Sequence, residues 1–348
     1  MVRNNARRGP KVIDFTAGQT RLSGHAFGRE ISACSSPERV FGLAPRLKIL
    51  LCTLNGARFL HEQLMSFEAQ SLTEWDLVVS DDGSKDETLE ILAGFRQRWQ
   101  GRHEVSVFEG PGRGVAVNYL GLLCRPEVPV APVALSDQDD VWHPEKLSRA
   151  MNGLAVLDER KPGLYGALST HVNAQMVPVG SARVPARPLS FANALVQNVI
   201  SGQTVALNEA ALHLIRRAGV PPDLPFHDWW IYQLVTAAGG QVLLDPERVV
   251  AYRQHENNSI GANTLLRGRL RRLRQILDGT YGRWIQANLA ALAGAEEHLT
   301  PEARAIVSTL ADPRPGPARA RAMWRAGLYR QEPHATALVY LAALLGRI

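Results

Sequence analysis

The sequence predicts an α/β fold built on a doubly wound, mostly parallel sheet and followed by a helical C-terminal extension. Three observations support this prediction. Between residues 47 and 154, four short apolar runs alternate with four segments whose apolar residues recur at helical spacing. Polar and acidic residues follow these runs directly, where ligands bind to sheets of this kind. A composition of 45% hydrophobic and 21% charged residues in a chain of 348 is typical of a globular protein.

The expected elements follow one another in a regular order. Short continuous apolar runs are typical of buried parallel strands, and these lie at residues 47–54, 76–80, 104–108 and 131–136. A helix is predicted after each run, at residues 59–67, 88–99 and 115–123 and from Pro144 to residue 154. Later elements are strands at 164–169, 203–207, 242–244 and 249–252, a helix capped by Asn208 and ended by Gly219, and a helix that begins near Asp228.

The net charge of +6 is distributed unevenly along the chain. Residues 1–46 carry a net charge of +5, residues 264–348 carry +7, and the segment between them carries −6. We therefore predict three parts: a basic flexible N-terminal extension (1–46), an acidic α/β domain (47–263) and a basic helical C-terminal region (264–348). A nucleic-acid binder would need basic residues on one structured face, which this distribution disfavours.

The apolar runs and the spacing of the cysteines bear on the cellular compartment of the protein. The apolar run at 335–346 is shorter than the roughly 20 residues of a spanning helix, and the N-terminus lacks the apolar run of a signal peptide. The three cysteines, Cys34, Cys52 and Cys124, form no CxxC pair, so neither a disulfide framework nor a cysteine zinc site is predicted. We expect a reducing compartment and a cytoplasmic location.

Two carboxylates, Asp81 and Asp82, end the second apolar run and precede Gly83. A carboxylate at a strand end can accept hydrogen bonds from a base or a ribose. The alternative is a plain turn between strand and helix, with Ser84 or Asp86 as the helix cap.

A second acidic cluster follows the fourth apolar run, at Asp137, Asp139 and Asp140. Three carboxylates this close repel one another when all are ionised, and a divalent cation would remove that penalty. Carboxylates together with phosphate oxygens suit Mg²⁺ or Mn²⁺. A solvated acidic loop is the alternative, which the apolar flanks and Trp142 disfavour.

Three further residues have a structural and a functional interpretation. Arg113 lies in a glycine-rich turn that fits neither the dinucleotide fingerprint nor the P-loop, so it is a cation near a nucleotide or a surface turn residue. Asp228, between aromatic residues, is either a helix cap or a partly desolvated general base. His255 follows an apolar strand and is either structural or a ligand.

Taken in order, these motifs resemble those of family-2 glycosyltransferases of GT-A fold, and more narrowly of rhamnosyltransferase-like bacterial members. The resemblance covers about residues 47–263 and rests on the order of its motifs rather than on any one of them. The motifs are Cys52-Thr53-Leu54-Asn55-Gly56, Ser80-Asp81-Asp82-Gly83-Ser84, Asp137-Gln138-Asp139-Asp140-Val141-Trp142-His143-Pro144-Glu145-Lys146-Leu147 and His227-Asp228-Trp229. Lys85 departs from the small polar residues frequent at its position.

The resemblance implies a role for each of these positions. It implies that Asp82 recognises the base and that Asp228 is the catalytic base. It implies a D-x-D element at Asp137 and Asp139, with Asp139 on the metal and Asp137 on the ribose or the metal. The remaining implied contacts are Thr53, Asn55 and Arg113 with the nucleotide, Gly202 beside the donor sugar, and His255 with the metal or the diphosphate.

The reaction implied by the resemblance is the transfer of a sugar from a nucleotide diphosphate to an acceptor hydroxyl, with inversion at the anomeric carbon. We expect Mg²⁺ or Mn²⁺ as cofactor, a nucleotide-sugar donor with dTDP-rhamnose as first choice, and a glycan or lipid-linked acceptor in cell-surface polysaccharide synthesis. Two other classes stay open: a phosphotransferase or phosphatase with Asp137 as nucleophile, and a non-enzymatic nucleic-acid binder.

The segment 264–274 interleaves leucines with arginines. Such a stretch would suit an anionic membrane surface on the inner face of the membrane, and equally a helix packed on the core with its arginines in water. The sequence does not specify an oligomeric state.

Overall fold

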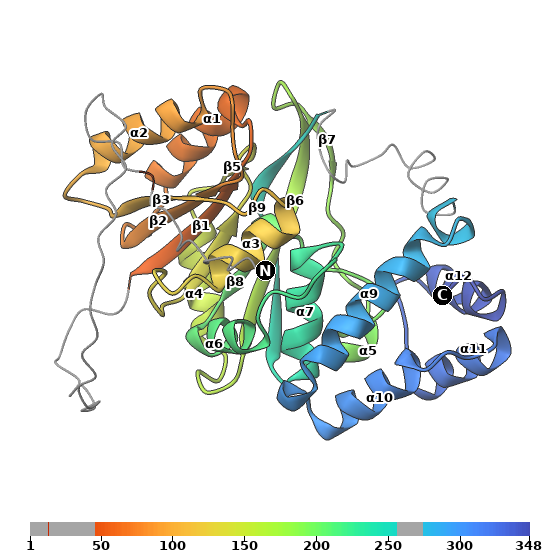
Figure 1. Cartoon of the computed structure of the whole chain (residues 1–348). Coiled ribbons are helices and arrows are strands. Elements are labelled where there is room, and N and C mark those ends of the chain that lie inside the picture. The colour runs from red at the N-terminus through yellow and green to blue at the C-terminus, as the bar shows by residue number, and fades with distance from the viewer. Residues whose placement is uncertain (1–12, 14–45, 256–273) are drawn as a thin grey trace, which may run out of the picture.

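The computed structural model describes residue 13, residues 46–255 and residues 274–348 (Figure 1). The predicted flexible extension at 1–46 and the arginine-rich stretch at 264–274 therefore lie almost wholly outside the described residues. The strands of the described part are β1 (Leu47–Thr53), β2 (Trp75–Asp81), β3 (Val105–Glu109), β4 (Val133–Ser136), β5 (Val141–Trp142), β6 (Gly163–Asn173), β7 (Pro178–Ser181), β8 (Ala206–Leu207) and β9 (Gln241–Gln254).

Helices connect and follow these strands. They are α1 (Ala57–Glu68), α2 (Thr88–Trp99), α3 (Val115–Leu123), α4 (Lys146–Ala155), α5 (Phe191–Ala194), α6 (Glu209–Ala218), α7 (His227–Ala237), α9 (Thr280–Gly294), α10 (Pro301–Ala311), α11 (Gly316–Arg325) and α12 (Pro333–Leu344), with 3₁₀ turns η1 (Gly202–Thr204) and η2 (Glu296–His298). The predicted bounds of the helices at 88–99 and 115–123 are confirmed, as is the capping of α6 by Asn208, whose side chain accepts a bond from Ala211 N.

The sheet of the described part has the order β3-β2-β1-β4-β8-β6-β9-β5, and β7 pairs with β6. Strands β1 to β4 are mutually parallel, as predicted, and β8 joins them to β6 and β9 through antiparallel pairs. Strands β6 and β9 again run parallel to each other. The carboxyl ends of β1 to β4 therefore meet at one edge of the sheet.

The apolar side chains of β1 point alternately to the two faces of the sheet, because successive residues of a strand point to opposite sides. Ile49 and Leu51 belong to the cluster under α1, α2 and α4, whereas Leu50 and Cys52 belong to the cluster under α3, α6 and α7. Helices thus cover both faces, and the prediction of a doubly wound sheet is confirmed.

Two predicted strands differ in detail from the structure. The strand expected at 203–207 is limited to β8, because Thr204 N and Oγ1 both donate to Ser201 O and close the turn η1. The strands expected at 242–244 and 249–252 form one strand, β9, whose pairing with β6 slips between Asp245 and Arg248. Pro246 lies in this slip, since proline has no N–H for the ladder.

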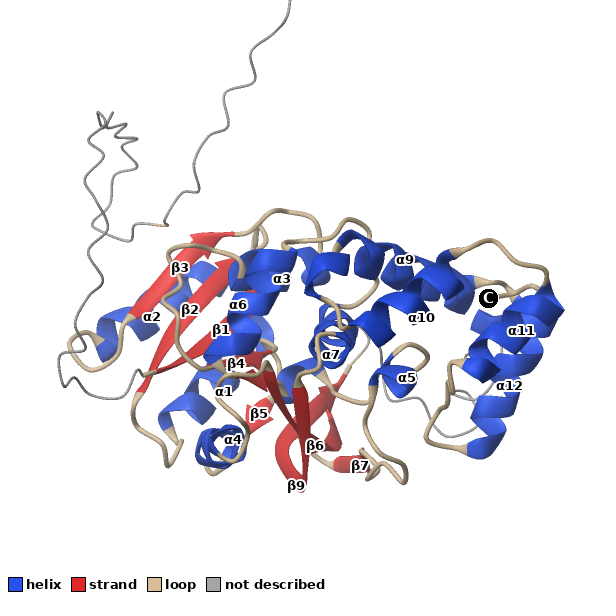
Figure 2. Cartoon of the chain, turned by 90° about the horizontal axis from the view of Figure 1, so that it is seen from below, coloured by secondary structure: helices blue, strands red, loops and turns tan. Residues whose placement is uncertain are grey.

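The C-terminal helices α9 to α12 lie at the end of the molecule opposite β3 in both views (Figures 1 and 2). They continue the apolar cluster under α7: the rings of Trp229 and Tyr281 stack at 6.4 Å, and Tyr281 OH donates to Val196 O at 2.5 Å. Among the described residues, no helix is long and apolar enough to cross a membrane.

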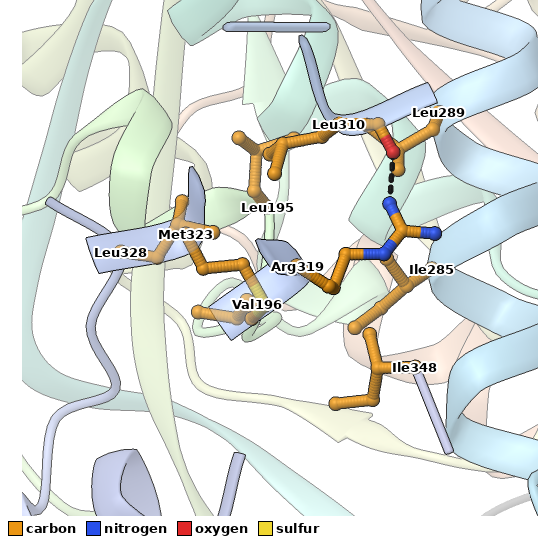
Figure 3. A pocket seen from close by; sticks show the side chains of 9 residues that line it. All are labelled: Leu195, Val196, Ile285, Leu289, Leu310, Arg319, Met323, Leu328 and Ile348. Carbon is orange, nitrogen blue, oxygen red and sulfur yellow. Dashed lines mark hydrogen bonds between the residues drawn. The ribbon is translucent and has the colours of Figure 1, made fainter. Parts of the chain in front are cut away.

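A small cavity remains between these helices and the core (Figure 3). Its volume of about 10 Å³ leaves room for about one water molecule. Arg319 closes it by donating from Nη1 to Leu310 O. We therefore regard this cavity as a packing defect of the helical region. The residues around it are Leu195, Val196, Ile285, Leu289, Leu310, Arg319, Met323, Leu328 and Ile348.

Candidate active site

The carboxyl ends of β1, β2 and β4 bring three polar loops together. In the register of the sheet, Thr53 lies beside Asp81, and Leu51 lies beside Ser136. The loops after Thr53, Asp81 and Ser136 contain most of the residues predicted to bind a nucleotide or a metal. The sheet therefore places them at one edge, in the position expected for a doubly wound fold.

Asp81 organises the loop between β2 and α2. Its carboxylate accepts hydrogen bonds from Thr53 Oγ1 at 2.7 Å, from Ser84 Oγ at 2.6 Å, and from the N–H groups of Gly83 and Ser84 at 3.1 and 2.8 Å. Thr53, predicted to line the nucleotide pocket, is 2% exposed, and its hydroxyl is used in this network. In the structure, the Thr53 side chain therefore contacts Asp81.

Asn55 connects the β1 and β2 loops from an exposed position. Its Oδ1 accepts a bond from Lys85 N, and its own N–H donates to Ser84 Oγ, both at 2.8 Å. Its φ of 49° is left-handed, a conformation that asparagine adopts more readily than most residues. The backbone shape at Asn55 thus depends on this pairing of loops.

Asp82 and Arg113 are brought together, as the resemblance implied. The carboxylate of Asp82 accepts from Gly112 N at 2.7 Å and from Gly114 N at 3.0 Å. Both glycines have positive φ, 64° and 88°, which allows the turn to wrap around the carboxylate. Asp82 therefore holds the exposed loop that carries Arg113 close to the carboxyl end of β2.

The acidic loop after β4 is largely buried. Burial, followed by the charge of Asp139, raises the pKa of Asp137 to about 7; Asp228 raises it further, whereas a hydrogen bond from Tyr119 opposes the shift. Tyr119 OH donates to Asp137 Oδ1 at 2.9 Å and also to Ser136 O. Asp140 is 0% exposed, and burial raises its pKa well above the usual range.

His255 and Asp139 lie in direct contact, with Nε2 and Oδ2 separated by 2.8 Å. The neighbouring Arg253 fixes the same loop: its backbone N–H donates to Asp140 Oδ1 at 3.0 Å, and its Nε donates to Asp139 O at 2.9 Å. Its Nη2 also contacts Glu62 Oε2 of α1 at 2.7 Å. Strand β9 thus attaches the acidic loop to α1 through a guanidinium that is 1% exposed.

Asp228 lies in the first turn of α7, and its charge is one of the smaller causes that raise the pKa of Asp137. Its Oδ2 accepts a bond from Gly202 N at 3.0 Å, and its Oδ1 accepts one from Trp229 N at 2.7 Å. A Cβ at Gly202 would lie 2.9 Å from His227 Nε2, so a larger residue would push against α7. Gly202 and Asp228, predicted separately, are therefore in contact.

Tyr119 and Arg253 were not singled out from the sequence. Tyr119 stacks on His227 at a centroid distance of 4.0 Å and so connects Asp137 with the start of α7. In the sequence it is one apolar residue among others on a helix face, which gives no signal of this contact. Trp229 and Trp230 are 3% and 0% exposed, so both rings are packed inside the protein.

The acidic loop suits a divalent cation of the Mg²⁺ type. In the part of the chain that the structure describes, no three histidine, cysteine or acidic side chains form a metal cluster. Mg²⁺ commonly takes one or two protein carboxylates and completes its shell with substrate phosphates and water. The carboxyl groups of Asp137 and Asp139 are partly exposed and repel each other when both are ionised, which agrees with such an open donor set.

The model of one protein family, glycosyl transferase family 2, matches residues 48–158 of this chain. A dTDP-rhamnosyl transferase, RfbG of Shigella flexneri, is 24% identical over 249 residues, which cover 70% of this chain and 84% of that protein. An uncharacterized glycosyltransferase of Nostoc sp. is 29% identical over 104 residues, 30% of this chain and 31% of that protein.

The fold has a counterpart among solved structures. The crystal structure of S. aureus TarS 1-349 is similar with a TM-score of 0.50 at 15% identity, over 81% of this chain and 89% of that one. The family match decides against the phosphotransferase and nucleic-acid-binding alternatives. Residues 48–158 therefore match glycosyl transferase family 2, and the mixed sheet has the GT-A fold.

Proposed function

We propose that this chain is an inverting, metal-dependent glycosyltransferase that moves a sugar from a nucleoside diphosphate to an acceptor hydroxyl. The observation that supports it best is the connection between the acidic loop and the start of α7: Tyr119 OH donates to Asp137 Oδ1 at 2.9 Å, and its ring stacks on His227, the residue before Asp228. A general base and a diphosphate-binding loop must face each other across the sugar, because attack and departure occur on opposite sides of the anomeric carbon.

Asp228 is the proposed base. A sugar hydroxyl is a weak nucleophile, so a carboxylate must accept its proton as the new bond forms. Donation from Gly202 N and Trp229 N holds the two oxygens of Asp228 in one orientation. The base is thereby positioned before substrate binds.

Asp137, Asp139 and His255 would hold Mg²⁺ or Mn²⁺ together with the donor diphosphate. When bound, the cation supplies Lewis-acid stabilisation of the charge that develops on the departing nucleotide. Thr53 and Asn55 support the nucleotide edge through their loop contacts, and Asp82 and Arg113 occupy the same edge.

For the donor we propose dTDP-rhamnose, supported by the printed function of the Shigella flexneri relative. For the acceptor we propose a glycan or a lipid-linked glycan of a cell-surface polysaccharide. The reaction would then take place in the cytoplasm, at the inner face of the membrane for a lipid-linked acceptor.

A panel of nucleotide sugars tests the donor and the cation. We expect dTDP-rhamnose with Mn²⁺ to raise the melting temperature more than UDP- or GDP-sugars do, because a ligand at about 100 times its Kd adds about 2.7 kcal/mol to stability. EDTA should remove most of that shift. If no nucleotide sugar raises the melting temperature with either Mg²⁺ or Mn²⁺, the proposed reaction is wrong.

Asp228→Asn tests the base. The amide keeps the size of the side chain but cannot accept the proton, so transfer should fall by about 10²- to 10⁴-fold while donor affinity is retained. The matched control is Asp223→Asn, an exposed position with positive φ that asparagine tolerates. Full transfer activity in Asp228→Asn would contradict the assignment.

A further inference from the structure

Helix α12 is apolar over most of its circumference, with His334, Thr336 and Tyr340 as its polar residues, although it lies at the surface. Its twelve residues, Pro333–Leu344, include no Asp, Glu, Lys or Arg. One side packs on the core through Val339, Ala342 and Ala343. A helix that is apolar on all sides is normally buried on all sides, in a protein core or in lipid.

The other side of α12 is open. Leu338 is 39% exposed, Leu341 50%, Leu344 49% and Leu345 61%. The steps of three to four residues from Leu338 to Leu341 and on to Leu344 or Leu345 place these side chains on one side of α12 and its C-cap. Isolated exposed leucines need no explanation, but a stripe of them along one helix indicates an interaction surface.

Helix α11 lies against α12 and carries an exposed aromatic residue of its own. A Cβ at Gly316 would lie 2.1 Å from Leu344 O, so the start of α11 touches the end of α12 and the two helices run antiparallel. On α11, Trp324 is 72% exposed, whereas its neighbours Ala322 and Met323 are buried. We call Trp324, Leu338, Leu341, Leu344 and Leu345 the α11–α12 surface.

The surroundings of this surface are strongly basic. Residues 313–348 contain six arginines and a single acidic residue, Glu332. Arg321, Arg325 and Arg347 are exposed, on α11 itself and just beyond α12. Exposed leucines and a tryptophan next to arginines match the boundary between lipid headgroups and acyl chains.

We propose that the α11–α12 surface docks on an anionic lipid bilayer. Trp324 and the leucines enter the interfacial layer, and Arg321, Arg325 and Arg347 contact lipid phosphates. The basic charge favours this occupant over a second copy of the chain, because a two-fold contact would bring like-charged arginines face to face. The inference deepens the proposed function by giving a lipid-linked acceptor a place of contact, and its test needs no donor.

Vesicle co-sedimentation tests the proposal. The full chain should pellet with phosphatidylcholine vesicles that contain phosphatidylglycerol at low salt, and much less with phosphatidylcholine alone. The double variants Trp324→Ser/Leu341→Ser and Arg321→Gln/Arg325→Gln should each lower the partition coefficient about tenfold or more. All four side chains are exposed, so the melting temperature should stay as in the unmodified chain.

The matched control is Val156→Ser/Arg160→Gln. It changes a valine that, at 73%, is as exposed as Trp324, and an exposed arginine, both in the α/β domain. This variant should bind vesicles normally. Full binding by both α11–α12 variants, or no binding by the unmodified chain, overturns the proposal. Sedimentation velocity tests whether a second copy of the chain covers this surface instead. A dimer that is lost in Trp324→Ser/Leu341→Ser would show that it does, and would overturn the proposal of docking on a bilayer.

Discussion

Gly56 lies between β1 and α1 at a point where another side chain has taken its space. A Cβ there would lie 2.3 Å from Gln138 Oε1. The Gln138 amide pairs with the backbone of Leu54, accepting from its N–H at 2.9 Å and donating to its C=O at 3.1 Å. A small residue at one loop therefore allows the acidic loop, more than 80 residues later, to attach to β1.

Gly56→Ala should displace the Gln138 side chain and break both of these hydrogen bonds. We expect the free energy of unfolding in urea to fall by about 1–3 kcal/mol and donor affinity to weaken, because Gln138 lies between Asp137 and Asp139. Gly94→Ala is the control, since no atom lies within 4 Å of its Cβ and it should gain about 0.5–1 kcal/mol in a helix. Equal stability of the two variants would contradict this account.

At the scale of elements, the ion pair between Arg149 and Asp245 joins α4 to β9. Nε and Nη2 of Arg149 contact the two Asp245 oxygens at 2.8 Å each, and Tyr165 OH donates to the same carboxylate at 2.9 Å. Burial raises the pKa of Asp245, but the bonds from Arg149, Glu247 N and Tyr165 outweigh it and hold the pKa below its usual range.

Because the folded pKa is lowered, the Asp245 carboxylate stabilises the fold above its unfolded pKa, and this stability is lost as the pH falls through the folded value. Asp245→Asn should lower the free energy of unfolding by about 1.5–3 kcal/mol at neutral pH. The difference from the unmodified chain should narrow in urea titrations as the pH falls below about 4.

Glu247→Gln provides the comparison for this pH series, because Glu247 is exposed on the same strand and should change stability by less than about 0.5 kcal/mol. A difference between Asp245→Asn and the unmodified chain that stays constant with pH would exclude a role for the charge.

At the scale of the molecule, the helices after residue 273 share their apolar cluster with the sheet. Leu292 of α9 is 0% exposed and belongs to the cluster that contains Leu50 of β1 and Trp230 of α7. The boundary predicted near residue 263 therefore separates segments of different charge that bury one continuous core. That core predicts a single cooperative unfolding transition for the described parts.

Leu292→Ala tests this coupling. We expect the free energy of unfolding to fall by about 2–5 kcal/mol and a single calorimetric transition to appear at a lower temperature. Binding of the donor should raise the temperature of that same transition. Leu277→Ala, at a position 54% exposed, should leave the transition nearly unchanged. A separate early transition that the donor does not move would indicate an independent helical unit.

Much of the catalytic edge was predictable because the relevant signals are local. Each parallel strand is a short apolar run, and an acidic or glycine-rich loop must follow it where the chain leaves the sheet. For Asp82 and Arg113 the local pattern left a plain turn open, and only the family resemblance implied that both lie near the nucleotide; in the structure Asp82 holds the loop of Arg113 through Gly112 and Gly114.

Other parts of the site could not be predicted, because their partners are far apart along the chain. Tyr119 resembles any inward helical residue, although its hydroxyl contacts Asp137. Arg253 follows a strand and carries no motif of its own, although it contacts the backbone of Asp139 and the side chain of Glu62. The sequence also did not show that α12 leaves a stripe of leucines exposed, because local hydrophobicity does not show which side of a helix packs on the core.

The order of strands, the residues after them and the family resemblance follow from local pattern, since alternation, apolar run length and turn residues act over a few positions. The tertiary structure decided that Gly202 contacts Asp228, that Tyr119 connects Asp137 with the start of α7, and that α11 and α12 leave leucines and a tryptophan in contact with solvent. These properties depend on distances between segments up to about 200 residues apart, which exist only once burial of the shared core has brought the segments together.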